Sequence, residues 1–200
     1  MKNLSELTLA DLKAMKPRPE VWAFAKACGG DLQKFWDTCP NGDWLLWLLR
    51  QTGNLSEPNA RKIGLAYAHK VLPIFEQNVP NDNRPRRCLQ AVENYLEKPT
   101  RANQNAMFVA ANAAHTAGAT YAAAASAYYA ACYPSGSASA DYAVHFATAA
   151  TAVIATDNSF CSTADVGARK KFDKWGANQV RSLLKLPAQK SKPPKARPQP

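Results

Sequence analysis

Residues 102–140 contain no aspartate, glutamate, lysine or arginine, and alanine dominates them. Alanine has the highest intrinsic helix propensity, and the rest of the chain shows little of the alternation of β-branched residues that is typical of strands. The sequence therefore predicts an all-α protein, a multi-helix bundle. Because small side chains let helices approach closely, we expect residues 101–131 and 138–156 to form a central antiparallel pair, joined by a turn at 133–141.

A hairpin of membrane-spanning helices is the competing interpretation of this alanine-rich region. Its first helix is long enough to cross a bilayer. The region nevertheless has few of the large apolar residues that drive insertion, and the mean hydropathy of the chain is −0.37. It also contains several polar residues, namely Asn103, Gln104, Asn105, Asn112 and His115. We therefore expect no contact with a membrane.

Residues typical of helix ends divide the rest of the chain. Pro19 suits a first turn, Gly29–Gly30 ends one helix, Asp31 caps the next, and Ser56–Pro58 starts another. Pro73 removes one backbone hydrogen bond inside a long helix, where we expect a kink rather than a break. The expected helices cover residues 8–15, 19–28, 31–37, 43–52, 58–79, 84–97, 101–131, 138–156 and 163–186.

The length of 200 residues suits one domain, which we place at residues 1–186. Residues 187–200 are rich in proline and lysine, and we expect a disordered basic tail. The formal net charge is +10, and no acidic residue follows Asp173. Cations of this C-terminal region can bind polyanions by releasing counterions: Lys185, Lys190, Lys192, Lys195 and Arg197. A tail that only aids solubility is the plainer interpretation, and we favour it.

The polar and sulfur-containing residues do not form a recognisable metal or cofactor motif. Five scattered cysteines without a C-x-x-C pair predict neither a disulfide framework nor a zinc site, and reduced thiols fit the cytoplasm. The N-terminus lacks the apolar segment of a secretion signal. His69, His115 and His145 occur singly. Asp141 and His145 are spaced i, i+4, but the second Glu-x-x-His of a bundle metal site is absent. We expect no cofactor.

Motifs for enzymatic catalysis are also missing. The sequence contains no G-x-S-x-G, no P-loop, no dinucleotide-binding glycine pattern and no H-E-x-x-H. The acidic residues do not recur as a spaced pair on one apolar face. We therefore predict that the protein is not an enzyme.

The segment "GDWLLWLLR", residues 42–50, predicts a short helix with Asp43 as its N-cap. Its apolar run surrounds the whole helix, and a helix that is apolar on all sides is normally buried. We therefore expect a core made of Trp44, Leu45, Trp47, Leu48 and Leu49. The alternative is that one tryptophan edge, with Arg50 beside it, anchors a partner, since Trp and Arg dominate binding hot spots.

The segment "NDNRPRRCLQ", residues 81–90, predicts a turn followed by a helix with Pro85 in its first turn. Asp82 could cap this helix or pair with Arg84, Arg86 or Arg87. A structural turn is the interpretation we favour. The alternative is a fixed cationic site that grips a carboxylate or a phosphate.

These two segments resemble the signature regions of an immunity protein family of bacterial polymorphic-toxin systems, the immunity-5-like group. The first matches a W-x-x-C-x-x-G-D-W-L-L-W-L motif between Trp36 and Leu48, and the second matches D-x-R-P at Asp82–Pro85. A final helix with Gln179, Leu183 and Leu184 completes the resemblance, which spans residues 20–186. The resemblance implies an all-helical protein that neutralises a toxin by direct binding, and it carries over no catalytic residues.

Two function classes follow from the sequence. The first is a binding protein that blocks a toxin or another effector. The residues that we expect to contact this protein target are Asp43, Trp44, Trp47, Arg50, Asp82, Arg84, Arg86 and Arg87. The alternative is a nucleic-acid-associated or phage-encoded accessory protein that uses the basic tail. This second class lacks the interleaved exposed aromatic residues expected for base stacking.

Overall fold

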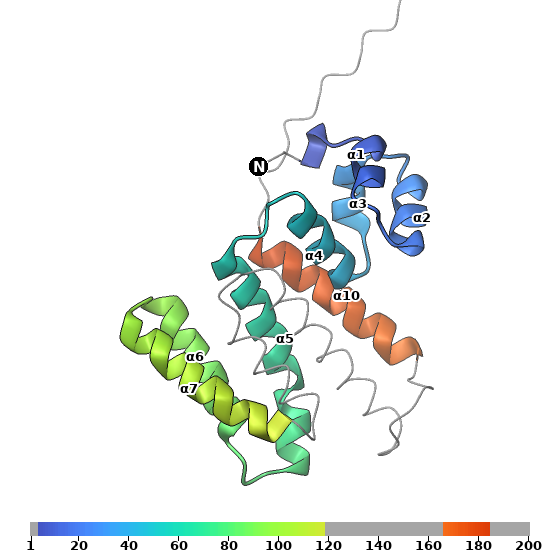
Figure 1. Ribbon diagram of the computed structural model, residues 1–200. Coiled ribbons are helices and arrows are strands. Elements are labelled where there is room, and N and C mark those ends of the chain that lie inside the picture. Colours follow the sequence, from blue (N-terminus) through green and yellow to red (C-terminus); the bar gives the residue numbers. More distant parts are fainter. Residues whose placement is uncertain (1–3, 119–165, 185–200) are drawn as a thin grey trace, which may run out of the picture.

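The computed structural model describes residues 4–118 and 166–184, and all regular structure in them is helical. A single 3-10 turn, η1 (Leu4–Glu6), precedes the α-helices in Figure 1. The helices are α1 (Leu9–Ala14), α2 (Pro19–Ala27), α3 (Leu32–Thr38), α4 (Gly42–Gln51), α5 (Glu57–Asn78), α6 (Arg84–Glu97), α7 (Arg101–Gly118) and α10 (Val166–Leu183). The predicted all-α class is confirmed.

Most predicted helices agree with the structure to within one or two residues. The predicted helix 101–131 is confirmed as α7 up to Gly118, and the predicted helix 163–186 corresponds to α10. The predicted helix 138–156, the turn before it and the tail 187–200 lie outside the described residues. The domain boundary at 186 lies outside them too.

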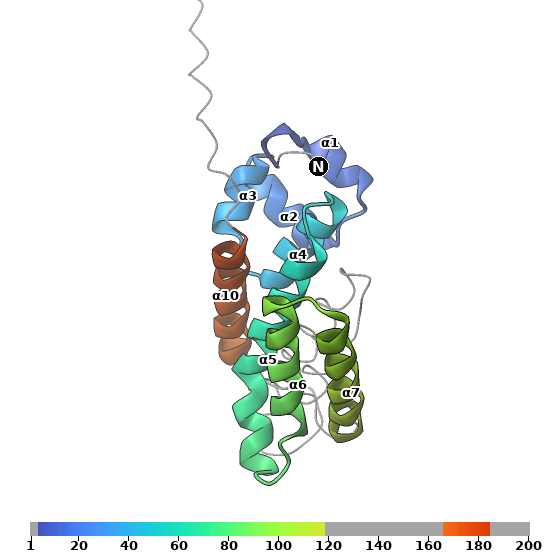
Figure 2. The same ribbon diagram turned by 90° about the vertical axis from the view of Figure 1, so that its left-hand side faces the viewer.

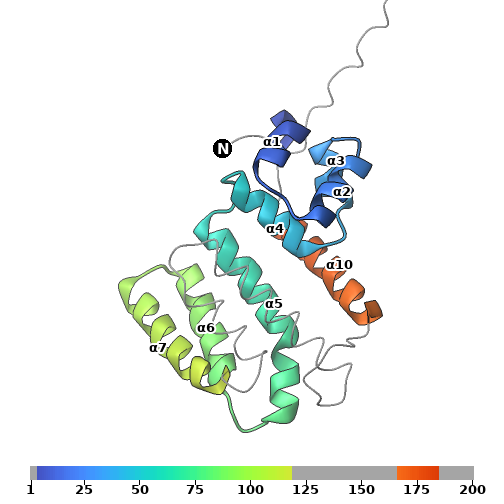
Figure 3. The same ribbon diagram turned by 45° about the vertical axis from the view of Figure 1, so that its right-hand side comes forward.

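Helix α5 lies between a helical hairpin and α10. Figures 1 and 3 show α6 and α7 side by side on one side of α5, with α10 on the other. Helix α4 packs against α10. Figure 2 shows α1, α2 and α3 gathered at one end, with α5, α6, α7 and α10 running lengthwise below them. The short N-terminal helices thus cover one end of a bundle of longer helices.

The first three α-helices begin and end within one residue of the predicted positions. The Asp31 carboxylate accepts hydrogen bonds from the backbone N–H groups of Gln33 and Lys34, at 2.9 and 3.0 Å, which confirms it as the cap of α3. Gly29 follows the end of α2 with a φ of +73°, a conformation that residues with a Cβ rarely adopt. These ends fix the short connection between α2 and α3.

Helix α5 continues through Pro73 from Glu57 to Asn78. Proline removes one backbone donor, but its ring here lies on the exposed side of the helix. Leu72 and Phe75, on either side of it, are buried. The prediction that Pro73 would not break the helix is therefore confirmed.

Helices α6 and α7 form an antiparallel hairpin, and hydrogen bonds hold the loop that connects them. The Thr100 hydroxyl accepts a hydrogen bond from the Asn103 N–H at 3.2 Å and caps α7. The Asn103 side-chain amide donates in turn to the carbonyls of Asn94 and Lys98, at 3.1 and 2.8 Å, near the end of α6. One side chain thus satisfies acceptors that the helix end would leave open.

A buried guanidinium joins this hairpin to α5. Arg61 is 1% exposed, and it donates to the Glu57 carboxylate through Nε and Nη2, at 3.1 and 2.9 Å. Its guanidinium lies 5.5 Å from the centre of the Tyr95 ring on α6, and its Nη1 is 3.7 Å from Met107 Sδ on α7. A buried charge is costly unless it is paired, so these contacts hold α5, α6 and α7 in one register.

Helices α4, α5 and α10 meet at a close crossing built on two glycines. A Cβ on Gly42 would lie 2.2 Å from the Tyr67 hydroxyl oxygen, and one on Gly176 would lie 1.8 Å from it. Phe172 and Trp175 of α10 pack on the same Tyr67 ring, with ring centres 5.6 and 5.1 Å away. Only residues without a Cβ let α4 and α10 approach the buried tyrosine this closely.

Arg181 ties α10 to the segment that precedes α4. Its Nε donates to the Trp36 carbonyl at 2.7 Å, and its Nη2 donates to the Cys39 carbonyl. Both carbonyls belong to the C-terminal end of α3, which carries partial negative charge. Cys39 is buried, and this burial raises the pKa of its thiol to about 11. The described cysteines, Cys28, Cys39 and Cys88, are buried, and none of them forms a disulfide.

Candidate functional site

Helix α4 begins one residue earlier than the sequence predicts, and its cap is Asn41. The Asn41 side-chain oxygen accepts hydrogen bonds from the N–H groups of Asp43 and Trp44, at 2.9 and 3.3 Å. Asp43 therefore lies in the first turn, so the prediction of Asp43 as the N-cap was wrong. Its carboxylate still stands at the positive end of the helix dipole, where a negative charge is favourable.

The two sides of α4 differ sharply in burial. Its four leucines are fully buried and form the inner face: Leu45, Leu46, Leu48 and Leu49. Trp44 and Trp47 are only half-buried, on the side that also carries Asp43 and the exposed Arg50. The prediction that Leu45, Leu48 and Leu49 are core residues is confirmed, whereas Trp44 and Trp47 are only partly buried against that core. The residues that the sequence put forward for partner binding on α4 share its outer face.

Phe24 of α2 extends this outer face into an aromatic surface. It is half-buried, and its ring centre lies 5.9 Å from that of Trp44 and 5.2 Å from that of Phe35 beneath. Trp47 follows Trp44 by three residues, a spacing that places the two on one side of a helix. We call Phe24, Trp44 and Trp47 the aromatic ledge. Phe35 is buried and supports the ledge from below.

The buried hydroxyl of Tyr67 lies against the start of α4, near two carboxylates. Burial raises the pKa of Tyr67, and the nearby carboxylates of Asp43 and Asp173 raise it further. The tyrosine therefore stays neutral at physiological pH. The neutral tyrosine packs against Gly42 and Gly176 and so joins α4, α5 and α10 at this point.

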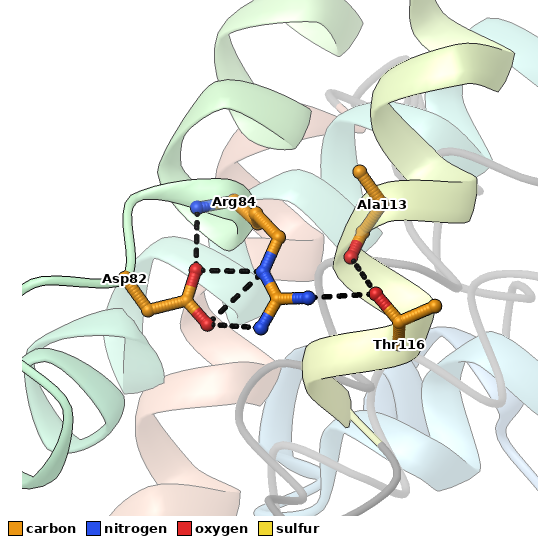
Figure 4. Close-up of polar contacts among 4 residues, drawn as sticks. All are labelled: Asp82, Arg84, Ala113 and Thr116. Atoms are coloured by element: carbon orange, nitrogen blue, oxygen red, sulfur yellow. Dashed lines mark hydrogen bonds and ion pairs between the residues drawn. The ribbon is translucent and has the colours of Figure 1, made fainter.

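The turn before α6 holds Asp82 and Arg84 as a closed pair, as Figure 4 shows. The Asp82 carboxylate accepts from the Arg84 N–H at 3.0 Å and from the guanidinium at Nε and Nη2, at 2.9 and 2.6 Å. Arg84 Nη1 also donates to the Thr116 hydroxyl at 2.8 Å, and this hydroxyl donates to the Ala113 carbonyl at 2.7 Å. Hydrogen bonding to Arg84 lowers the pKa of Asp82. The pair links the start of α6 to α7.

The second arginine of this turn is also paired within the chain. Arg86 donates to both carboxylate oxygens of Glu76 on α5, at 2.7 and 2.6 Å, and this hydrogen bonding raises the pKa of Arg86. Arg87 is exposed. Two of the three arginines thus donate to carboxylates within the chain. The pairing of Asp82 with Arg84 is one of the options that the sequence offered, whereas the pairing of Arg86 with Glu76 was not predicted.

The structure does not bring the two predicted binding segments together. Gly42, at the start of α4, packs on Tyr67 of α5, whereas the Asp82 turn follows the end of α5 at Asn78. Tyr67 and Asn78 are about 16 Å apart along a helix axis. Figure 1 shows α4 beside α10 and the connection to α6 at the far end of α5. The predicted partner-binding residues therefore form two separate surfaces.

Other features considered from the sequence are absent from the described part of the chain or lie outside it. In residues 4–118 and 166–184, no three His, Cys, Asp or Glu side chains gather closely enough to hold a metal ion. None of the described helices combines the length and the apolar character that a bilayer crossing requires. The predicted polyanion-binding residues Lys185, Lys190, Lys192, Lys195 and Arg197, and also Asp141 and His145, lie outside the described residues.

The sequence did not reveal all contributors to these surfaces. Phe24 gave no signal, because its role in the ledge depends on how α2 packs against α4. Lys70 of α5, which belongs to neither surface, also gave no signal, because its neighbour Trp175 of α10 comes from a distant part of the chain. No single-sequence pattern could have paired these residues.

Comparison with known proteins adds no relative. No protein-family model matches the chain, and no curated protein or solved structure matches it either. The resemblance to immunity proteins therefore stays a prediction that depends on its motifs.

Proposed function

We propose that this protein is an immunity-type inhibitor located in the cytoplasm. It binds a toxin or another effector protein and neutralises it by direct contact. The observation that carries the proposal is the aromatic ledge. Phe24, Trp44 and Trp47 form one half-buried aromatic surface, with Arg50 exposed on the same side of α4. Trp and Arg are the residues most enriched in binding hot spots, and half-exposed indoles can be covered by a partner.

The support beneath the ledge favours a binding role. Asn41 caps α4, and the four leucines of its inner face are buried. Arg181 and the Gly42–Gly176 crossing fix the helix on its neighbours. A rigid surface loses little conformational entropy on association, so more of the contact energy remains for affinity. The resemblance to immunity proteins fits these two faces of α4, since its motif includes both inner leucines and the outer tryptophans.

The charge of the chain restricts the target. A net charge of +10 repels basic proteins and favours a target with an acidic face. Arg50, at the edge of the ledge, is placed to meet a carboxylate at the rim of such an interface. The arginines of the Asp82 turn are not part of the proposed surface, because this turn lies at the far end of α5 from α4 (Figure 1).

A capture experiment followed by a toxicity test examines the proposal. The full chain is used as bait in host lysate at moderate salt and with added nuclease, and each retained protein is then expressed alone and together with the bait. We expect one retained protein that arrests growth alone and is harmless beside the inhibitor. Retention of no protein, or of proteins whose expression is harmless, would overturn the proposal.

Two exposed arginines provide matched variants for the same test. Arg50→Glu reverses a charge beside the ledge, and Arg87→Glu makes the identical change at the start of α6. We expect Arg50→Glu to abolish the rescue of growth and Arg87→Glu to preserve it. The opposite pattern would assign binding to the Asp82 turn instead. Circular dichroism of both variants checks that they are folded.

A further inference from the structure

The outer face of α10 is basic over its first half. Lys170, Lys171 and Lys174 are exposed, whereas Phe172 and Gly176 face the interior. The single acidic residue of this helix, Asp173, lies near Tyr67. None of these three lysines forms an ion pair in the part of the chain that the structure describes.

Helix α5 adds a fourth lysine next to these three. Lys70 Nζ lies 5.6 Å from the centre of the Trp175 ring, which is half-buried. Tyr67 and Phe172 hold the indole from inside, with ring centres 5.1 and 5.4 Å away. Lys171 precedes Trp175 by four residues and so lies on the same side of α10. The indole therefore has a lysine from each helix beside it.

Four unpaired ammonium groups on one surface repel each other, and a polyanion removes that cost. We propose that this lysine face (Lys70, Lys170, Lys171 and Lys174) binds the phosphate backbone of a single-stranded nucleic acid without base specificity. This site is separate from the aromatic ledge and does not depend on the proposed inhibitor function. It is also distinct from the basic C-terminal residues 185–197.

The chemistry of the lysine face fits a phosphate chain better than a small anion. The lysines extend along two helices rather than converging on one point, and a lysine is a point charge without the fork that arginine offers to a single phosphate. An aromatic ring between cations is typical of surfaces that follow single strands, where base stacking adds to phosphate contacts. Both features favour a linear polyanion.

An acidic protein is the competing ligand, and the neighbouring residues argue against it. The exposed positions that continue this side of α10 are polar, Asn178 and Ser182. A stable protein interface requires a desolvated core with apolar side chains. Apart from the partly covered Trp175, the lysine face offers none.

Fluorescence anisotropy of a labelled oligothymidylate of about 20 nucleotides tests the proposal with the full chain. Four phosphate contacts predict a slope of log K against log[NaCl] of about −3, measured between about 50 and 200 mM salt. The variant Lys70→Gln/Lys171→Gln/Lys174→Gln removes three of these contacts. We expect it to bind about tenfold more weakly or worse, with a slope about two smaller in magnitude.

A charge-matched variant distinguishes binding at the lysine face from attraction to the overall positive charge of the protein. Lys13→Gln/Lys34→Gln/Lys98→Gln removes three exposed lysines from α1, α3 and the end of α6. We expect this variant to bind the oligonucleotide within about twofold of wild type. Equal losses in the two triple variants would overturn the proposal, because binding would then follow net charge alone.

Two further experiments test the competing explanations. A variant with Lys190, Lys192, Lys195 and Arg197 changed to glutamine tests the C-terminal region, and loss of binding only in this variant would overturn the lysine face. Polyglutamate tests the ligand class. Competition by polyglutamate as strong, per charge, as that by unlabelled oligothymidylate would reject a nucleic-acid site in favour of one for acidic proteins.

Discussion

The Tyr67 hydroxyl occupies the point where three helices come closest. Alanine normally stabilises a helix interior by about 1 kcal/mol relative to glycine. At Gly176 the added Cβ would lie 1.8 Å from the hydroxyl oxygen and 2.6 Å from Cζ of Tyr67, so the neighbouring atoms must shift. The packing cost therefore opposes the gain in helix propensity at this one position.

We expect Gly176→Ala to lower the free energy of unfolding by about 3 kcal/mol, because overpacking a tight site forces backbone and side-chain shifts. Urea denaturation measures the change. In a Tyr67→Phe background the hydroxyl contact is gone and the Cζ contact remains, so the loss should become smaller without vanishing. Stabilisation by Gly176→Ala in the wild-type background would contradict the observed crossing.

Asp82 should contribute stability that depends on pH in the acid range. Its pKa is lowered in the folded protein, so its contribution is complete above the unfolded value of about 3.9 and is lost as pH falls below it. The difference in unfolding free energy between wild type and Asp82→Asn should therefore shrink on acidification from neutral pH. An Arg84→Met background should abolish this pH dependence, and its persistence there would contradict the assigned pair.

Cys39 should make the stability of the protein depend on pH in the alkaline range. Its contribution should fall as pH rises, whereas that of Asp82 falls as pH decreases. The folded pKa of about 11 lies above the unfolded value of about 8.5, so the folded state favours the neutral thiol. Its contribution to stability is complete below about pH 8.5 and declines as pH rises toward 11. Cys39→Ala should flatten the stability profile over that interval in chemical denaturation. An unchanged slope would show that the thiol is accessible to water.

At the scale of the elements, α4 shows what a single sequence can and cannot predict. Helix positions followed from caps such as Asp31 and from breakers such as Gly29, which act locally. The cap of α4 was misplaced because Asn41 and Asp43 are equally good capping residues two positions apart. The inner and outer faces could not be told apart within the apolar run, because six consecutive apolar residues occupy every direction around a helix.

The two candidate caps of α4 can be separated by mutation. Asn41→Ala should cost about 1 kcal/mol of unfolding free energy, since it removes the acceptor for two first-turn N–H groups. Asp43→Asn should cost less, about 0.5 kcal/mol, because the amide keeps the shape of the carboxylate and removes the charge that the helix end favours. Thermal or urea unfolding compares the two. A larger cost at Asp43 would contradict the observed cap.

At the scale of the whole molecule, the candidate surfaces depend on contacts between distant parts of the chain. Arg181 reaches the carbonyls of Trp36 and Cys39, and Gly176 meets Tyr67 and Gly42. These pairings are set by three-dimensional packing and leave no local pattern in one sequence. The sequence alone therefore predicted the tryptophan edge as one alternative, but it could not add Phe24 or separate the edge from the Asp82 turn.

The central claim is that a protein target covers the aromatic ledge. Oxidative footprinting of the full chain, free and bound to its captured target, tests it through the tryptophan side chains themselves. Trp44 and Trp47 should lose reactivity on binding, while Trp175 of the lysine face keeps its own and the buried Trp36 stays unreactive in both states. Protection of Trp175 with unchanged Trp44 and Trp47 would contradict the claim and move the target to α10.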